Sequence, residues 1–282
     1  MLLSFKQARD YVYTHGALWE RVLFGHLFEA APLSHVHQCL ACYKNPDGGW
    51  AHGIEHDLKT PDSHPLGLEF ALWIFRTTGV YHNNLFNDAA EWVDRNRAPD
   101  GALLNPASVL DYPHAPWWSD NGGQTKPTSI VGNLMRMDLC TPTVAASTAR
   151  WVQANLPLAA VRANEWLFMA YHAHDYFLHV EDFPQVEAYR AAALDNIVQL
   201  AEAAEEKRYY QWLLLANSPN SALAKAAPPA LTKRILDGLA AMQGADGAWH
   251  DEHGLAHWSP WVTIVVLSGL RNYGVWDGDK AG

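Results

Sequence analysis

A short phrase that recurs along the chain constrains its fold more than any other feature. Asp47-Gly48-Gly49-Trp50 returns as Asp100-Gly101 and again as Asp246-Gly247-Ala248-Trp249. The first interval is 53 residues and the second is 146, close to three further units of about 49. Glycine reaches positive φ without steric cost, so each copy predicts a tight turn after a helix. A period near 50 residues is typical of a helix pair with its connections.

The rest of the chain carries apolar residues at steps of three and four, which is the helical pattern. Even "WVTIVVLSGL", the segment most like a strand, is expected to be a buried helix with a glycine stop. The predicted helices are Phe5–Tyr13, Trp19–Ala30, Ser34–Tyr43, Leu66–Thr77, Asn84–Asn96, Thr128–Met137, Thr143–Ala154, Asn164–Phe177, Ala188–Ala204, Lys207–Ala216, Ala230–Met242 and Pro260–Tyr273. About twelve helices in about six pairs would close into a toroid with an inner and an outer ring.

The stretches 45–70 and 243–270 resemble the repeats of terpenoid cyclases and protein prenyltransferase β-subunits. In those repeats a Q/N-x-x-D-G-x-W turn lies between two helices. The resemblance implies an all-α (α/α)6 toroid of about six helix pairs, formed as a single domain over residues 1–282. It does not imply an activity, because one fold serves many reactions.

The activities of those two families are not expected here. Terpenoid cyclases of the protonating class use a D-x-D-D acid, and this chain has no such motif. Protein prenyltransferases hold zinc with an Asp and a Cys two residues apart, and no Asp-x-Cys occurs. We therefore predict no cofactor and no metal.

Two local patterns could still suggest a metal. His52 to His56 matches H-x-x-E-H, but it follows a Gly-Gly turn and contains Gly53, whereas a zinc peptidase needs that motif on a helix. His35, Cys39 and Cys42 share one helix face, and the sequence leaves open whether they bind a metal or pack as small apolar groups.

Composition narrows the partners. Thirty acidic residues against twenty Lys and Arg disfavour a nucleic-acid partner, which needs a basic face. No apolar run approaches the roughly 18 residues of a membrane span, and the first residues do not read as a signal peptide. Three cysteines suit a reducing compartment, so a cytoplasmic location is expected. A homo-oligomer remains open.

The segment 53–64 holds the strongest catalytic candidates: Glu55, Asp57 and His64. Crowded carboxyl groups at a cavity mouth raise one another's pKa, which would leave an acid protonated near neutral pH. Pro65 is expected to open a helix, and the structural alternative is that Asp62 or Ser63 caps it while the other groups face water.

Aromatic residues supply the candidate substrate wall, since thirteen Trp and fifteen His exceed ordinary usage. The turn-rich segment 110–123 and the last repeat combine indole rings with histidines, which suits a wall against an apolar or ring-shaped ligand. A further pair, Asp175 and His179, lies one helical turn apart and could be a carboxylate that orients a histidine. The wall candidates are Tyr112, His114, Trp117, Trp118, His250, Trp258 and Trp261.

These groups favour an enzyme that uses acid–base chemistry on a neutral, largely apolar small molecule, by isoprenoid-like isomerisation, dehydration or cyclisation. Glu55 or Asp57 would donate the proton, and His64, His114 or His250 would accept one. The rings of Trp117, Trp118, Trp258 and Trp261 would hold the substrate or stabilise positive charge. Two alternatives remain: a carbohydrate hydrolase or lyase on a similar helix ring, and a binding or scaffold protein without catalysis.

Overall fold

The computed structural model describes residues 3–118 and 124–276. Among them are 14 α-helices that, with short 3-10 turns, make up 59% of these described residues, and their strands form one two-stranded sheet. The all-α prediction is therefore confirmed. No described helix combines the length and apolarity that a bilayer crossing requires. The chain divides into two compact units, one made of residues 1–39 and 197–282 and the other of residues 40–196. The prediction of one domain over 1–282 stays a prediction.

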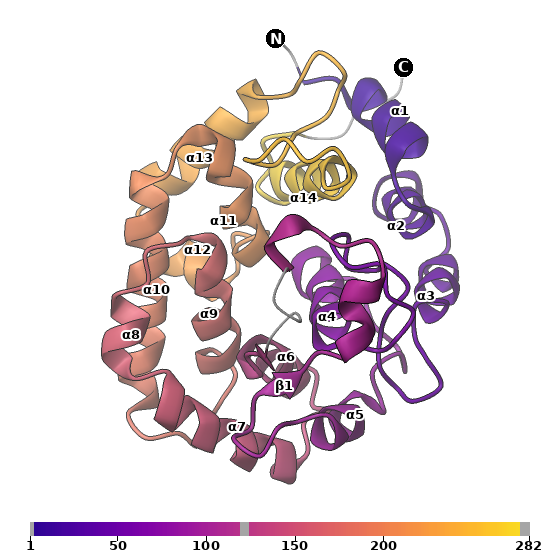
Figure 1. Ribbon diagram of the computed structural model, residues 1–282. Helices are drawn as coiled ribbons and strands as arrows, with labels where there is room; N and C mark the ends of the chain where they lie inside the picture. The colour runs from indigo at the N-terminus through magenta and orange to yellow at the C-terminus, as the bar shows by residue number, and fades with distance from the viewer. Residues whose placement is uncertain (1–2, 119–123, 277–282) are drawn as a thin grey trace. The chain divides into compact units, whose positions relative to one another are not determined.

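The unit of residues 40–196 is built on three neighbouring helices, α4, α6 and α9 (Figure 1). α5 and α7 pack together and against α6. The two strands pair antiparallel, with Leu103 opposite Thr125. The elements of this unit are α4 (Pro65–Thr78), α5 (Ala89–Arg95), β1 (Leu103–Leu104), η1 (Ala107–Asp111), η2 (Pro116–Trp118), β2 (Gln124–Thr125), α6 (Thr128–Arg136), α7 (Pro142–Asn155), α8 (Leu158–Arg162), η3 (Phe168–Ala170) and α9 (Tyr171–Phe177).

In the other unit, α14 packs against both α2 and α11, and α1 and α13 also contact α14 (Figure 1). Residues 259–270 of α14 are all buried, which explains why its sequence is apolar on every face. The elements here are α1 (Phe5–His15), α2 (Leu18–Glu29), η4 (Glu206–Arg208), α11 (Tyr209–Leu215), α12 (Ala222–Ala226), α13 (Pro229–Ala241) and α14 (Ser259–Asn272). The boundaries between the units along the chain fall within α3 (Leu33–Ala41) and α10 (Val186–Ala203).

The three DG turns have the same geometry. Gly48, Gly101 and Gly247 have φ of +90°, +94° and +92°. In each, the preceding Asp accepts a hydrogen bond from the amide two residues on, at 2.9, 3.0 and 3.1 Å. Each glycine amide also donates to the carbonyl three residues back, at 2.9 to 3.0 Å. The repeated phrase is thus a repeated turn, as the sequence predicts.

Side chains around two of the turns tie them to their helices. Asp47 accepts from the Trp92 indole at 3.2 Å and from the Ser63 hydroxyl at 2.7 Å. The Trp249 indole donates to the carbonyl of Leu239 at 2.7 Å, in the last turn of α13. That carbonyl also accepts from the amide of Met242, the C-cap residue, at 3.2 Å, so the tryptophan adds a second hydrogen bond at this helix end.

Two glycines with positive φ make a matched pair for testing the turns. At Gly247 an added Cβ would lie 2.4 Å from the backbone carbon of Gln7, whereas at Gly79, with φ +71°, it would meet nothing within 4 Å. Gly79→Ala should cost about 1–2 kcal/mol for the left-handed backbone alone. Gly247→Ala should cost about 1–3 kcal/mol more because the Gln7 backbone must move. Urea unfolding of both variants measures this, and equal losses would contradict the close approach.

Helix boundaries differ from the predicted ones most at four places. α5 begins at Ala89 and not at Asn84, α9 begins at Tyr171 and not at Asn164, and α8 and α12 were not predicted from the sequence. The expected cap of α4 is also wrong: its N-cap is His64, whose Nδ1 accepts from the Gly67 amide at 3.1 Å, and neither Asp62 nor Ser63 fills that position. Pro65 opens the helix as predicted.

Candidate functional site

The segment before α4 folds back on itself and buries its acidic residues. The amide of Asp57 donates to Glu55 Oε2 at 2.9 Å, and His52, with φ +62°, bonds through its amide to the carbonyl of Thr60 at 3.1 Å. The side chains of Glu55, His56 and Asp57 are 8%, 7% and 9% exposed. The structural alternative, in which these groups face water, is therefore not what the structure shows. The three residues are buried and retain only a small accessible surface.

The segment of Tyr112 to Trp118 runs beside these acids. Leu58 forms an antiparallel bridge with His114, and the amide of Ala115 donates to the carbonyl of Asp57 at 2.9 Å. The structure thus brings together two groups of sequence-predicted site residues, one from each side of this bridge. Residues 119–123 of the same predicted loop lie outside the described residues.

The side chains of this segment are accessible. Tyr112 and Trp117 are 40% and 54% exposed, and Trp118 is half-buried. His114 Nδ1 lies 2.7 Å from the carbonyl oxygen of Tyr112, so it carries a proton, and Nε2 is the nitrogen that can accept one. An imidazole held in this tautomer suits a general base.

Electrostatics single out Glu55. Burial raises the pKa of Glu55 well above its usual range, and the negative charge of Asp57 raises it further. The Asp57 amide and the ammonium of Lys59 oppose this shift without cancelling it. Both effects favour the protonated form of Glu55, which is the state a proton donor needs.

His64 is buried and its geometry favours a structural role. Its Nδ1 accepts the helix amide, which leaves the proton on Nε2, and burial lowers its pKa to about 4. An imidazole with so low a pKa is a weak base, so His64 is not carried into the proposal below.

The remaining predicted site residues lie in the other unit. His250 Nδ1 is 2.9 Å from Ser259 Oγ, and its Nε2 is 3.2 Å from Asp246 Oδ2. Trp261 is 2% exposed and lies 5.7 Å from the ring of Trp19, whereas Trp258 is half-buried.

Sequence reasoning missed a buried ionic network at the contact of α4, α6 and α9. Arg76 forms a short ion pair with Asp175 Oδ2, which also accepts from Ser129 Oγ at 2.8 Å and from Asn133 Nδ2 at 3.0 Å. His174 Nδ1 donates to Asp175 Oδ1 at 2.9 Å. The hydrogen-bond partner of Asp175 is thus His174 rather than the predicted His179.

The partners of Asp175 offset the cost of burying its negative charge. Burial alone would raise the pKa of Asp175, but the charge of Arg76 and the hydrogen bonds of His174 and Ser129 lower it below its usual range. The carboxylate is 1% exposed and ionised, so its partners are what make the buried charge tolerable.

A second buried carboxyl, Glu69, lies on α4 near this network. Tyr171 donates to Glu69 Oε2 at 3.1 Å, and burial, with a smaller contribution from Asp175, raises the pKa of Glu69 to about 8. The sequence does contain a signal that Glu69 is buried. Glu69 is an acid inside the apolar run of Pro65–Phe75, in which nearly every residue is buried.

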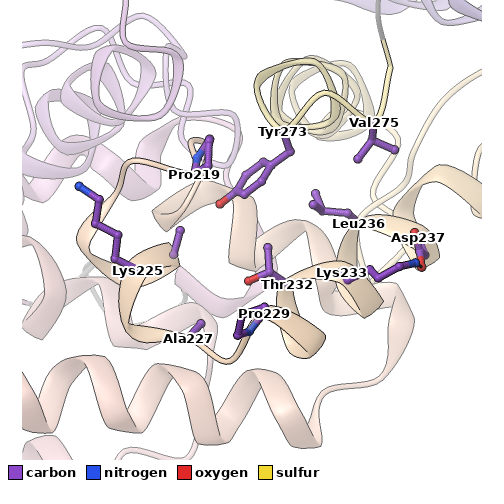
Figure 2. Close-up of a pocket in the computed structure, with 11 residues that line it drawn as sticks. Pro219, Lys225, Ala227, Pro229, Thr232, Lys233, Leu236, Asp237, Tyr273 and Val275 are labelled. Carbon is purple, nitrogen blue, oxygen red and sulfur yellow. Dashed lines mark hydrogen bonds and ion pairs between the residues drawn. The ribbon is translucent and has the colours of Figure 1, made fainter.

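A pocket of about 460 Å³ lies between α12, α13 and the end of α14 (Figure 2). Its size suits a small ligand. Its walls are mostly apolar, the Tyr273 hydroxyl donates to the carbonyl of Ala216 at 2.8 Å, and Lys233 pairs with Asp237 at the rim. None of the sequence-predicted site residues lines it, and it offers no buried acid.

Among residues 3–118 and 124–276, no three His, Cys, Asp or Glu side chains are grouped so that they could hold a metal ion. Cys39 is half-buried and Cys42 is exposed. Comparison of the chain with protein-family models gives no match, and comparison with curated proteins gives none either.

Proposed function

We propose that this protein is an enzyme that protonates a neutral, largely apolar small molecule, with Glu55 as the proton donor. The reaction would be an isomerisation, dehydration or cyclisation. The observation that carries the proposal is a carboxyl group whose protonated form is favoured by burial and by the charge of Asp57, in a segment that retains accessible surface beside exposed aromatic rings. Protonation by a positioned acid contributes about 10²–10⁴-fold to a rate.

We further propose that the chain forms the (α/α)6 toroid of the terpenoid cyclase and prenyltransferase superfamily. Two features support this: the three DG turns share one geometry, and each unit has three packed helices with amphipathic helices beside them. His250, Trp258 and Trp261 enter the proposed site only if the toroid closes.

Roles follow for the residues beside Glu55. His114, with its accepting Nε2, would remove a proton from the cationic intermediate. Trp117 and Trp118 would stabilise positive charge on the substrate through their ring faces. Asp57 would hold the pKa of Glu55 high before the transfer and attract the cation after it.

Replacing Glu55 by Gln is expected to abolish proton donation. In D₂O with geraniol, nerol or linalool as probes, the native protein should incorporate deuterium into the product, and Glu55→Gln should reduce this at least about 100-fold. Mass spectrometry of the extracted products measures it. Glu91→Gln makes the same change at an exposed residue of α5 and should leave the rate unchanged.

The same variant has a second readout, which does not require the substrate. Since the folded pKa of Glu55 is raised, its stabilising contribution is complete below about pH 4 and is lost as pH rises through the folded pKa. Glu55→Gln should therefore flatten the decline in stability that begins as pH rises above about 4.3, whereas Glu91→Gln should not. If the free energy of unfolding falls with pH in the same way in the native protein and in Glu55→Gln, the proton-donor assignment is contradicted.

A carbohydrate substrate is the second candidate, favoured by the exposed ring of Trp117 near two carboxyl-bearing residues. Sugars stack on such rings, and paired carboxyl groups hydrolyse glycosidic bonds. Thermal shift by oligosaccharides but not by isoprenoid alcohols would favour this reading. A shift without turnover in either class would favour a binding protein.

A further inference from the structure

One oxygen of Glu69 has no partner. Glu69 is 3% exposed, and its Oε2 accepts from Tyr171, but its Oε1 is buried and makes no hydrogen bond with any described residue. A buried polar atom left this way costs about 1–3 kcal/mol, so an unmet one calls for an explanation.

Three aromatic rings form a row that leads from Tyr171, the hydrogen-bond partner of Glu69, to the surface. The ring of Trp73 lies 4.3 Å from that of Tyr171, in an edge arrangement, and both residues are less than 8% exposed. Phe168 packs edge-on against both, at 6.0 and 5.8 Å, and is 41% exposed. An apolar molecule that displaced the Phe168 ring would therefore meet Trp73 and Tyr171 first and Glu69 next.

The polar groups that face Glu69 are the hydroxyls of Tyr171 and Ser129, the cations Arg76 and Lys126, and the carboxylate of Asp175. Tyr171 donates to Oε2, so Oε1 is the atom left to carry the acid proton, which the raised pKa keeps in place at neutral pH. The ammonium of Lys126, which is exposed, lies within electrostatic range of Glu69. Asp175 is already occupied by Arg76 and three other donors.

We propose that Glu69, Lys126 and the rings of Trp73, Phe168 and Tyr171 form a binding site for an apolar compound that carries a carbonyl or carboxylate oxygen. Glu69 Oε1–H donates to that oxygen, and Lys126 favours negative charge on it. The rings cover the apolar body. This site stands on its own contacts and does not depend on proton donation by Glu55.

The donor character of the site selects this ligand class. A ketone or carboxylate oxygen accepts two hydrogen bonds, which matches one carboxyl proton and one ammonium. An alcohol brings its own donor, which would find no free acceptor on Oε1 while that atom carries the proton. An amine would meet Lys126 and Arg76, and their positive charges disfavour it.

Calorimetric titration with benzylacetone, the alcohol formed by its reduction, and hydrocinnamate tests the proposal. At about pH 6 the ketone and the carboxylate should bind at least about tenfold more tightly than the alcohol, a difference of about 1.4 kcal/mol. Between about pH 6 and pH 9.5 the affinity for benzylacetone should fall at least about tenfold, because Glu69 loses its proton with a pKa of about 8.

Variants at Glu69 separate this effect from other titrations. Tyr171 has a pKa raised well above 10 and His172 one lowered to about 3, so neither changes charge in this range. Glu69→Gln keeps a donor and should bind benzylacetone without the fall at high pH, whereas Glu69→Met should not bind it. Lys126→Met should weaken hydrocinnamate more than benzylacetone, since both lose the ammonium donor but only the former also loses the attraction between opposite charges.

Three results would overturn the site. They are equal binding of the alcohol and the ketone, the same pH profile in the native protein and Glu69→Gln, and no binding of any probe to a folded protein. The last result would mean that Oε1 bonds only to buried water.

Discussion

Replacing Arg76 by Met is expected to destabilise the protein by about 3–5 kcal/mol, since it leaves a buried carboxylate without its counter-charge. Asp175 is 1% exposed and the Arg76 side chain is 8% exposed, so water cannot take over the role of the guanidinium. The three remaining donors, from Ser129, Asn133 and His174, stabilise the charge but do not neutralise it. Urea unfolding at neutral pH measures the loss.

An exposed pair provides the control for this prediction. Arg9 pairs with Asp10 at 2.9 Å, but both side chains are exposed, so Arg9→Met should cost much less than Arg76→Met. The double variant Arg76→Met/Asp175→Asn should recover much of the loss, because it removes the unpaired charge and keeps an amide at position 175. If the double variant is as unstable as the two single losses combined, the network is not a coupled unit.

Replacing Gly132 by Ala should cost at least about 2–3 kcal/mol, the upper range for overpacking. An added Cβ at Gly132, in α6, would lie 2.1 Å from the carbonyl oxygen of Asp175 and 2.7 Å from the amide nitrogen of Tyr176. Both are backbone atoms of α9, so the clash can be relieved only by moving one helix away from the other. Ser129 and Asn133, beside Gly132, would then lose their bonds to Asp175.

Another helical glycine separates this clash from helix propensity. At Gly25, in α2, the nearest atom to an added Cβ is the Tyr13 hydroxyl at 3.2 Å, at the end of a side chain that can shift. Gly25→Ala should therefore be neutral or stabilising by up to about 1 kcal/mol. Denaturant unfolding of both variants decides the matter, and a neutral Gly132→Ala would show that α6 and α9 do not approach so closely.

The candidate site divides into parts that could and could not be predicted. Glu55 and Asp57 stood out because acids are crowded in one short segment. The structure shows that both residues are buried. His64 stood out for the same reason, yet its nitrogen caps α4. A histidine before a proline carries no mark that distinguishes a base from a helix cap.

The Arg76–Asp175 pair could not have been found by the same reasoning. The two members of that pair are 99 residues apart in the chain. Asp175 has histidines on both sides, at 174 and 179, and helical spacing favours the wrong one. Which histidine bonds to the carboxylate depends on which face of α9 packs toward α4 and α6, and that orientation is set by tertiary packing.

The local backbone is what the sequence alone determined: helical periodicity, and three turns at which only glycine adopts positive φ without strain. Such features depend on neighbours within a few residues, so composition and spacing suffice to predict them. Burial decided the rest. Whether Glu55, Glu69 or Asp175 carries a proton follows from the water removed and the charges brought near by helices distant in the chain, and these exist only once the helices pack.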